Sequence, residues 1–402
     1  MKASMRHRLR LIPAVLGVLA LAATGCGTRS GQPTAAEIDV RTLDVGSYST
    51  APLEFRYDYK HTLLDGTRLA VMRLADNMVL GAEIDATLHY LRGSGPILST
   101  TDAKKVLADV NGEVVERNRM LFGWALTVTD REPDREDPEA TKVTVSVMQF
   151  PDGATAERTA RELEQTDFAV APDLNQNVSI PNTPDAHAHW RPGIPTLGAT
   201  VAQGSYVINV LAEIPKPSLP QLTNLVRMAF DNQRRLLAAL PPLTREDILR
   251  LEYDPDRMFS RTLNPGADGA PSPFTQARYN SRGALAHVTE QYDRRKVFEA
   301  AGVDRLVTSG STGATLLFRT RDPAAALDLA GAVLGQKYTG TADTPEAVPN
   351  VRCGSKATDA GPGLRYRCMV PYGRYVAAVE SDQVIDLHQR AAAQYAILAN
   401  SY

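Results

Sequence analysis

The chain has 402 residues, of which 43% are hydrophobic, and it carries 44 basic and 46 acidic side chains. A chain of this length can form two domains with sizeable cores. The formal charge of −2 becomes −6 without residues 1–25, which carry four basic and no acidic side chains. A mildly acidic protein without a basic tract is a poor candidate for binding nucleic acid or an anionic lipid surface.

Residues 1–25 have the pattern of a secretory signal peptide. Basic side chains come first, and an apolar run from Leu11 to Ala23, interrupted by Pro13, follows them and ends in small residues. This run is shorter than the roughly 20 apolar residues that a membrane-spanning helix needs. We therefore expect the segment to be cleaved off and not to remain as a transmembrane anchor.

The end of the apolar run, Leu21-Ala-Ala-Thr-Gly-Cys26, resembles a bacterial lipobox. In that pattern the cysteine is joined to diacylglycerol and becomes the new amino terminus, although Ala23 stands where the pattern prefers leucine. The alternative is ordinary cleavage that leaves Cys26 unmodified. Because more than one acyl chain makes anchoring effectively permanent, we expect a lipid-anchored protein on the extracytoplasmic face of the cell membrane.

The other two cysteines, Cys353 and Cys368, lie 15 residues apart in a glycine-rich stretch that we expect to be a loop. In an oxidising exterior two such thiols are expected to form a disulfide. This pairing leaves Cys26 as the odd cysteine, which agrees with its acylation. The alternative, a metal site, lacks further cysteines or a nearby histidine.

Behind Cys26, residues 26–38 are small and polar, which is the composition of a flexible tether. A helix is predicted near residues 102–115. Apolar residues then alternate over residues 122–128 and again over residues 143–147. This alternation predicts a β-hairpin with one buried face.

Two parts of the chain follow the same order of strand, helix, strand and helix. Asp152 and Asp322 would cap the first helix of each copy, and Pro323 follows the second cap at a position that suits proline. A Gly-x-Tyr-Val sequence opens the second strand of each copy, 52 residues after the first cap and 51 after the second. The final helices are expected over residues 222–240 and 384–398. The spacing predicts a duplicated unit.

The uneven order of strands and helices favours the α+β class. We expect two similar domains, each a mainly antiparallel sheet with helices packed on one face. The N-terminal domain would span residues 39–242, and the C-terminal domain, with the disulfide, residues 243–402. A short helix from Thr244 to Leu251 would follow the join.

With these features the chain resembles the two-domain lipoproteins of actinobacteria, a family of unknown function. The resemblance rests on the lipobox, the segment Arg41–Tyr48 (RTLDVGSY), the two Gly-x-Tyr-Val strands and the cysteine pair of the second domain. It implies no catalytic residues. A weaker similarity, to the extracytoplasmic sensor domains of mycobacterial Ser/Thr kinases, implies at most a role in ligand sensing.

Four side chains are the main candidates for a site. His187 and His189 would point the same way on a strand, as a two-imidazole metal site requires, but a half-exposed strand face explains them as well. Tyr206 and Tyr375 occupy matching positions in the two copies and could line a groove. Their alternative role is that of a core aromatic residue with a hydrogen-bonded hydroxyl.

Other patterns give weaker signals. The acidic segment 129–141 lacks the oxygen spacing of a calcium loop, so we expect a solvated hairpin tip. Residues 309–313 (SGSTG) lack a following lysine and helix, so a turn is expected instead of a phosphate site. No Gly-x-Ser-x-Gly motif occurs. The histidines that could serve as bases are His61, His89, His287 and His388.

The leading hypothesis is a membrane-anchored, non-enzymatic lipoprotein without a cofactor, which binds an envelope protein or a ligand. The first alternative is an extracytoplasmic hydrolase or glycan-processing enzyme, which would need a nucleophile and a base in one pocket. The second alternative is a carrier of a lipid or another apolar ligand, which would need an apolar cavity inside one domain.

Overall fold

The structure is a computed structural model that describes residues 38–53, 62–133, 137–265, 269–310, 315–357 and 363–401. The expected signal peptide, Cys26 and nearly all of the tether lie outside these residues. Within the described part of the chain, no helix combines the length and the hydropathy needed to cross a bilayer.

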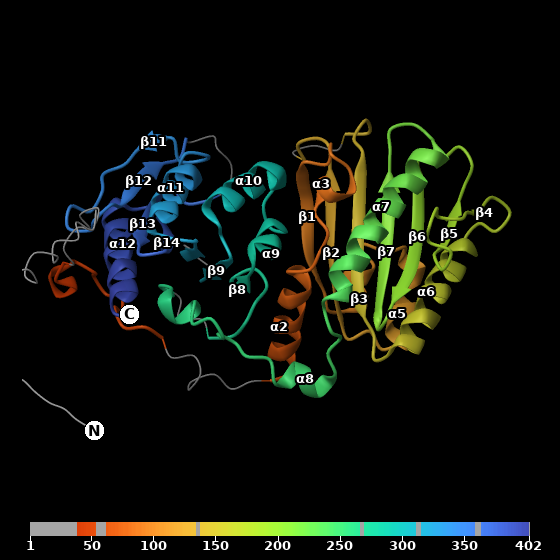
Figure 1. Cartoon of the computed structure of the whole chain (residues 1–402), viewed down its shortest axis with the longest axis horizontal. Helices are drawn as coiled ribbons and strands as arrows, with labels where there is room; N and C mark the ends of the chain where they lie inside the picture. The colour runs from red at the N-terminus through yellow and green to blue at the C-terminus, as the bar shows by residue number, and fades with distance from the viewer. Residues whose placement is uncertain are drawn as a thin grey trace, which may run out of the picture. The chain divides into compact units, whose positions relative to one another are not determined.

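The N-terminal half forms a seven-stranded antiparallel sheet from the described residues (Figure 1). The strands lie side by side in the order β1-β2-β3-β7-β6-β5-β4. The elements of this half are η1 (Val40–Thr42), α2 (Leu63–Ala75), α3 (Gly81–Ile84), β1 (Tyr90–Ile97), α4 (Thr100–Ala103), η2 (Asp109–Asn111), α5 (Gly112–Arg117), β2 (Phe122–Thr129), β3 (Lys142–Gln149), α6 (Gly153–Phe168), β4 (Gln176–Asn177), β5 (His187–Trp190), β6 (Thr196–Gln203), β7 (Tyr206–Glu213) and α7 (Leu219–Ala238).

The C-terminal half forms a second seven-stranded antiparallel sheet, in the order β8-β9-β10-β14-β13-β12-β11. Its elements are α8 (Arg245–Leu249), η3 (Phe259–Arg261), β8 (Gln276–Tyr279), α9 (Ser281–Leu285), α10 (Gln291–Ala301), β9 (Arg305–Ser309), β10 (Thr315–Arg319), α11 (Pro323–Leu334), β11 (Gly340–Thr341), β12 (Arg352–Ser355), β13 (Tyr366–Tyr372), β14 (Tyr375–Ser381) and α12 (Val384–Ala399).

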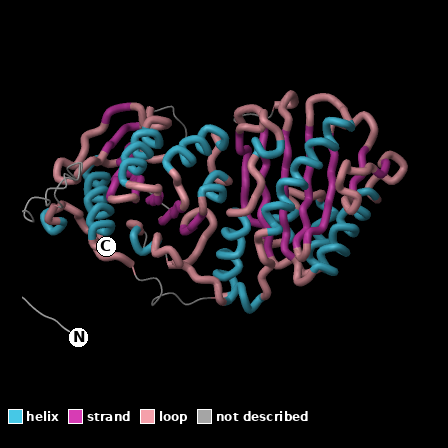
Figure 2. The backbone as a smooth tube through the Cα atoms, viewed as in Figure 1, coloured by secondary structure: helices cyan, strands magenta, loops and turns pink. Residues whose placement is uncertain are grey.

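The two strand orders are identical position by position, and Figure 2 shows the two sheets with their helices. The first helix of each copy, α6 or α11, begins at the predicted cap. Asp152 accepts a hydrogen bond from the N–H of Thr155 at 2.7 Å, and Asp322 accepts one from the N–H of Ala325 at 2.8 Å. The predicted α+β class and the duplication are confirmed.

The Gly-x-Tyr-Val sequence is a turn joined to the start of a strand. Gly204 and Gly373 have φ angles of 56° and 53°. Each glycine lies in a two-residue turn, because Gln203 pairs with Tyr206 and Tyr372 pairs with Tyr375. Such turns favour residues with positive φ, which glycine adopts without steric cost.

The helices of the N-terminal half lie on both faces of the sheet, and the expectation that they cover one face is wrong there. Helices α2 and α7 pack with the even-numbered residues of β2, whereas α4, α5 and α6 pack with Ala125, Met148 and Val207 on the other face. Strand β3 is buried along nearly its whole length. Val147 on one face of this strand and Met148 on the other are both apolar and buried, so the strand needs cover on both faces.

Three local predictions differ from the structure. The helix expected near residues 102–115 is divided into α4, η2 and α5. The helix expected from Thr244 ends at Leu249. The two cysteines of the C-terminal half lie on β12 and β13 and not in a loop, directly opposite each other.

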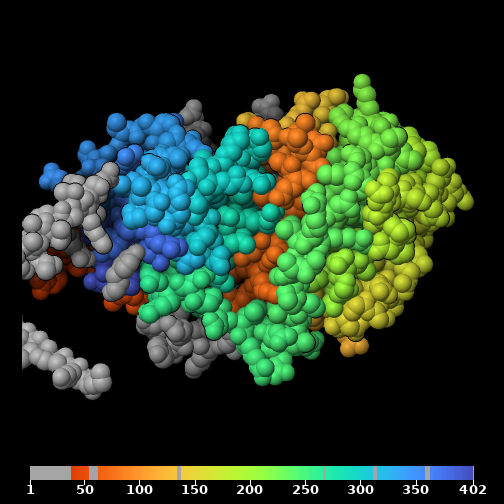
Figure 3. Space-filling view, in the orientation of Figure 1, coloured from red at the N-terminus to blue at the C-terminus, as the bar shows by residue number. Residues whose placement is uncertain are grey.

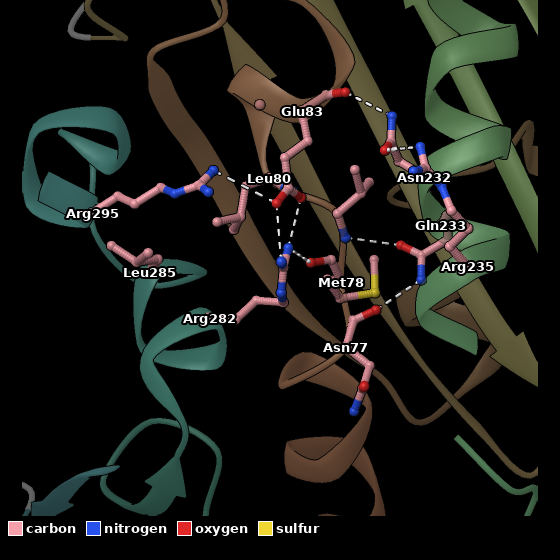
Figure 4. A network of polar contacts seen from close by, with 12 residues as sticks. Asn77, Met78, Leu80, Glu83, Asn232, Gln233, Arg235, Arg282, Leu285 and Arg295 are labelled. Carbon is pink, nitrogen blue, oxygen red and sulfur yellow. Dashed lines mark hydrogen bonds and ion pairs between the residues drawn. The ribbon is translucent and has the colours of Figure 1, made fainter. Parts of the chain in front are cut away.

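A buried glutamine in the last helix of each copy forms hydrogen bonds with the backbone of a segment outside the sheet. In α7, Gln233 accepts a hydrogen bond from the N–H of Val79 at 2.9 Å and donates one to the C=O of Asn77 at 2.8 Å (Figure 4). In α12, Gln394 accepts one from the N–H of Leu263 at 2.7 Å and donates one to the C=O of Arg261 at 2.9 Å. Both glutamines are fully buried.

Residues 40–402 form one compact unit, in which polar contacts join the two halves. Glu83 accepts two hydrogen bonds from Arg282, at 2.6 and 2.9 Å (Figure 4). Burial alone would raise the pKa of the Glu83 carboxyl, but the hydrogen bonds and charge of Arg282 outweigh burial and lower it. The N–H of Gly81 donates to Gln291, and the N–H of Leu91 donates to the C=O of Thr289, both at 2.8 Å.

Asp76 is a buried carboxyl in the same contact region. It accepts a hydrogen bond from the N–H of Asn280 at 2.8 Å. Burial raises the pKa of Asp76 to about 7, against the opposing effects of this hydrogen bond and of the nearby Arg278 and Arg305. The carboxyl is therefore partly protonated in the folded protein near neutral pH.

Replacing Gln394 by Leu should destabilise the protein by roughly 2–4 kcal/mol, because the N–H of Leu263 and the C=O of Arg261 lose their partner. Urea unfolding measures the difference in the free energy of unfolding. The matched control is Gln165→Leu, on the exposed side of α6, which should change this free energy by less than about 0.5 kcal/mol. Equal effects of the two substitutions would contradict the assigned role.

Asp76→Asn should make the protein more stable at pH 8 and its stability less dependent on pH. The pKa of the wild-type carboxyl is raised from 3.8 to about 7, so the unfolded chain loses this proton at lower pH than the folded one. Stability therefore falls as the pH rises between these values, and the amide abolishes this loss. Urea unfolding at several pH values, with the exposed Asp173→Asn as control, tests the sign.

Candidate functional site

A cavity of about 300 Å³ lies in the C-terminal half, between the β8–β10 side of the sheet and the helices α9, α10 and α11. Its apolar wall includes Phe298 and Phe318, which are 3% exposed, together with Leu306, Leu316 and Val333. The surface above this region, with α10 in teal and α11 in blue, is seen in Figure 3. The volume is at the lower end of the range for small-molecule pockets.

Three cationic side chains converge on this cavity: Arg294, Lys337 and Arg367. Arg367 is already paired, because it donates to Glu380 and its guanidinium lies 4.4 Å from the centroid of the Tyr338 ring. The position of Arg294 is different. Among the described residues its Nε has no hydrogen-bond partner, although this nitrogen is buried.

The environment of Arg294 favours an anion. Burial lowers the pKa of its guanidinium, and the charge of Glu290 acts in the opposite direction. A buried N–H without an acceptor costs about 1–3 kcal/mol, more for a charged group. An anionic ligand that accepts a hydrogen bond from Arg294 would relieve this cost.

His287 forms part of the floor of the cavity. Its ring packs against Tyr279 and Trp124, with centroid distances of 4.6 and 5.4 Å. Burial lowers the pKa of His287 to about 4, so the ring is neutral at pH 7. Its Nε2 has no hydrogen-bond partner in the described part of the chain. The ring can offer one hydrogen bond to a ligand, but it adds no charge.

Tyr206 and Tyr375 are both buried, with 2% and 8% of their surfaces exposed. The hydroxyl of Tyr206 donates to the C=O of Pro241 at 3.4 Å, and the guanidinium of Arg261 lies 5.6 Å from the centroid of the Tyr375 ring. Neither tyrosine lines the cavity described above. Their contacts fit the role of core aromatic residues, and a groove bordered by them stays a prediction.

His187 and His189 lie on β5, as the sequence predicts. The Nδ1 of His189 is 2.7 Å from a carboxylate oxygen of Glu164 on α6. This hydrogen bond raises the pKa of His189, although burial acts in the opposite direction. The described residues contain no group of three or more His, Cys, Asp or Glu side chains that could hold a metal ion. The pair between β5 and α6 accounts for His189 structurally.

Cys353 and Cys368 form the predicted disulfide. The bond joins β12 to β13 across one register pair. It therefore fastens two strands near the edge of the C-terminal sheet.

The other residues that the sequence singled out do not come together in one site among the described residues. His61 and Cys26 lie outside the described residues, as do residues 134–136 of the acidic segment and residues 311–313 of the SGSTG segment. The ring of His89 stacks on that of Tyr292 at 4.2 Å, and the Nε2 of His388 is 2.8 Å from the C=O of Asp343. Neither His89 nor His388 lines the cavity.

No sequence pattern pointed to Arg294 or to the apolar wall around it. The wall comes from a helix, two strands and a second helix, and α10 is a largely polar helix without a recognisable motif. Of the residues that the sequence singled out, His287 does line the cavity. It was a candidate base, but burial lowers its pKa and keeps the ring neutral.

Comparisons with known proteins give limited information. No curated protein matches the chain. Among solved structures, the extracellular domain of PknH from Mycobacterium tuberculosis aligns over 40% of this chain and 93% of that domain, with 12% identity and a TM-score of 0.30. A likeness at this score supports no inference about fold or function.

Two domain families match the chain. Residues 57–253 match the family described as domain of unknown function (DUF7373) N-terminal, and residues 258–401 match its C-terminal counterpart. These two matches meet near the join between the two sheets. The chain belongs to this two-domain family of unknown function.

Proposed function

We propose that this protein is a lipid-anchored, extracytoplasmic binding protein, without enzymatic activity, that takes a small amphipathic anion into the cavity of its C-terminal half. The observation that carries the proposal is the buried, unpartnered Nε of Arg294 beside an apolar wall. The anionic group would accept a hydrogen bond from Arg294 and lie near Lys337. The apolar part would contact Phe298 and Phe318.

The chemistry of the cavity supports binding more than hydrolysis. A hydrolase needs a nucleophile within hydrogen-bond reach of a base. The candidate base, His287, is surrounded by the rings of Phe274, Tyr279 and Trp124. The hydroxyl of Tyr279 donates to the C=O of Pro273 at 2.7 Å and is not directed at His287. These contacts hold a ring in place and do not activate a nucleophile.

The size of the cavity also distinguishes between ligands. A volume of about 300 Å³ suits a short-chain amphiphile better than a lipid with two long chains. This favours a small ligand over the carriage of a complete membrane lipid. The location at the membrane is a separate part of the proposal, and it rests on the Leu21–Cys26 pattern in the sequence.

Octanoate should bind the purified protein more tightly than 1-octanol, because only octanoate has a charge for Arg294 to pair with. Arg294→Gln should weaken octanoate binding about tenfold, which corresponds to about 1.4 kcal/mol, and leave 1-octanol binding nearly unchanged. Isothermal titration calorimetry measures both affinities. Lys296→Gln is the control, because it removes one positive charge from the exposed side of the same helix. Equal binding of the acid and the alcohol to the wild-type protein would refute the proposed ligand class.

The native protein should lack residues 1–25 and carry an acyl mass on Cys26, which mass spectrometry of the membrane fraction detects. Cys26→Ala should move the protein out of that fraction, because the acyl chains supply the membrane affinity. An intact leader, or a mature terminus without an acyl mass, would contradict the anchoring part of the proposal and leave the ligand test unaffected.

A further inference from the structure

A second cavity, of about 570 Å³, lies on the sheet of the N-terminal half. Its lining is mostly polar. It includes the hydroxyls of Thr127 and Thr144, which lie 2.8 Å apart on β2 and β3, the amide of Asn209 on β7 and the carboxyl of Asp167 near the end of α6. This cavity therefore differs in chemistry from the apolar, cationic cavity of the C-terminal half.

The two cavities occupy corresponding places in the duplicated unit. Asp167 stands as many residues after the cap Asp152 as Lys337 stands after the cap Asp322. Asp167 lines the N-terminal cavity and Lys337 lines the C-terminal cavity. Gly198 precedes the end of β6 by five residues, and Arg367 precedes the end of β13 by five. These two residues also line the cavities. These two matched pairs place the two cavities on the same face of the repeated sheet.

An unpartnered polar group faces the N-terminal cavity. Asn111, at the end of η2, lines it and is 3% exposed. In the described part of the chain its side-chain oxygen is buried and has no hydrogen-bond partner. Because a buried acceptor without a donor is costly, this oxygen is suited to a ligand that donates a hydrogen bond.

Three cations, Arg92, Lys105 and Lys142, and two carboxylates, Asp167 and Glu213, line the cavity, so its charges are nearly balanced. Lys142 pairs with Glu213 at 3.5 Å, and Lys105 pairs with Asp102 at 3.0 Å. An anionic ligand would have to compete with these carboxylates for its cations. The lining offers both hydrogen-bond acceptors and donors. They are Asn111, Asp167, the threonines Thr127 and Thr144, and the lysines Lys105 and Lys142.

We infer that the N-terminal cavity is a second binding site and that its ligand is a neutral saccharide. Each hydroxyl of a sugar can donate one hydrogen bond and accept others, which matches a lining of mixed donors and acceptors with balanced charge. The inference does not depend on the proposed function of the C-terminal cavity. It rests on the other cavity and on Asn111.

The matching residue of the C-terminal half, Arg367, suggests a substitution that would fill this cavity. A Cβ added to Gly198 meets nothing within 4 Å, and the backbone there has no positive φ. Gly198→Arg therefore places the counterpart of Arg367 in open space, at a position where the other copy of the fold carries an arginine. The variant should fold normally, and circular dichroism and thermal unfolding check this.

The test is saturation-transfer NMR and calorimetry with maltose, cellobiose and diacetylchitobiose. We expect the wild-type protein to bind at least one of them, and Gly198→Arg to weaken that binding at least about tenfold while octanoate binding stays unchanged. Asp167→Asn, which keeps the shape of the side chain, should weaken saccharide binding several-fold, whereas the exposed Asp173→Asn should not.

Two results would overturn the inference. One is that none of the three sugars binds the wild-type protein at millimolar concentration. The other is that a sugar binds equally well to the wild-type protein and to folded Gly198→Arg, which would place its site elsewhere. Loss of octanoate binding with retention of sugar binding would refute the proposed function alone, so the failures of the two proposals are distinguishable.

Discussion

Burial of the central strands on both faces is the constraint on which this fold depends. On one side of the sheet β2, β3 and β7 carry rows of apolar side chains, and on the other side Ala125, Met148 and Val207 are apolar and buried, so both sides need cover. Helices α2 and α7 cover one side, and α4, α5 and α6 cover the other. The buried glutamines Gln233 and Gln394 then satisfy backbone groups of the segments that this packing excludes from water.

The two copies keep the same framework and differ in what is attached to it. The register pair Ala188–Ala199 on β5 and β6 occupies the place that the disulfide pair Cys353–Cys368 occupies on β12 and β13. A methyl pair inside one sheet is thus replaced by a covalent link in the other. The two cavities differ in the same way, because matched positions carry residues of different charge and size while the strand order stays fixed.

Polar contacts between the two domains help to join residues 40–402 into one compact unit. Glu83 and Arg282 supply a charge-assisted pair, and Asp76 supplies a buried carboxyl that accepts from the backbone of the other half. The carboxyl that has a cationic partner keeps its charge, whereas the one governed by burial holds its proton to higher pH.

The sequence alone determined the antiparallel α+β class, the duplication, the capped helices and the disulfide. Local patterns encode the caps and hairpins, the repeated order of elements encodes the duplication, and the cysteine count in an expected oxidising exterior indicates the disulfide. Asp152 and Asp322 each cap a helix through a hydrogen bond to a residue three positions later, and Gly204 and Gly373 each lie in a two-residue hairpin turn. Only the tertiary structure decided which faces the helices cover and where the cavities lie. Arg294, Phe318 and Val333 line one cavity but come from three different elements. No short sequence pattern predicts that they lie together, because their packing depends on the whole sheet and on the helices that cover it.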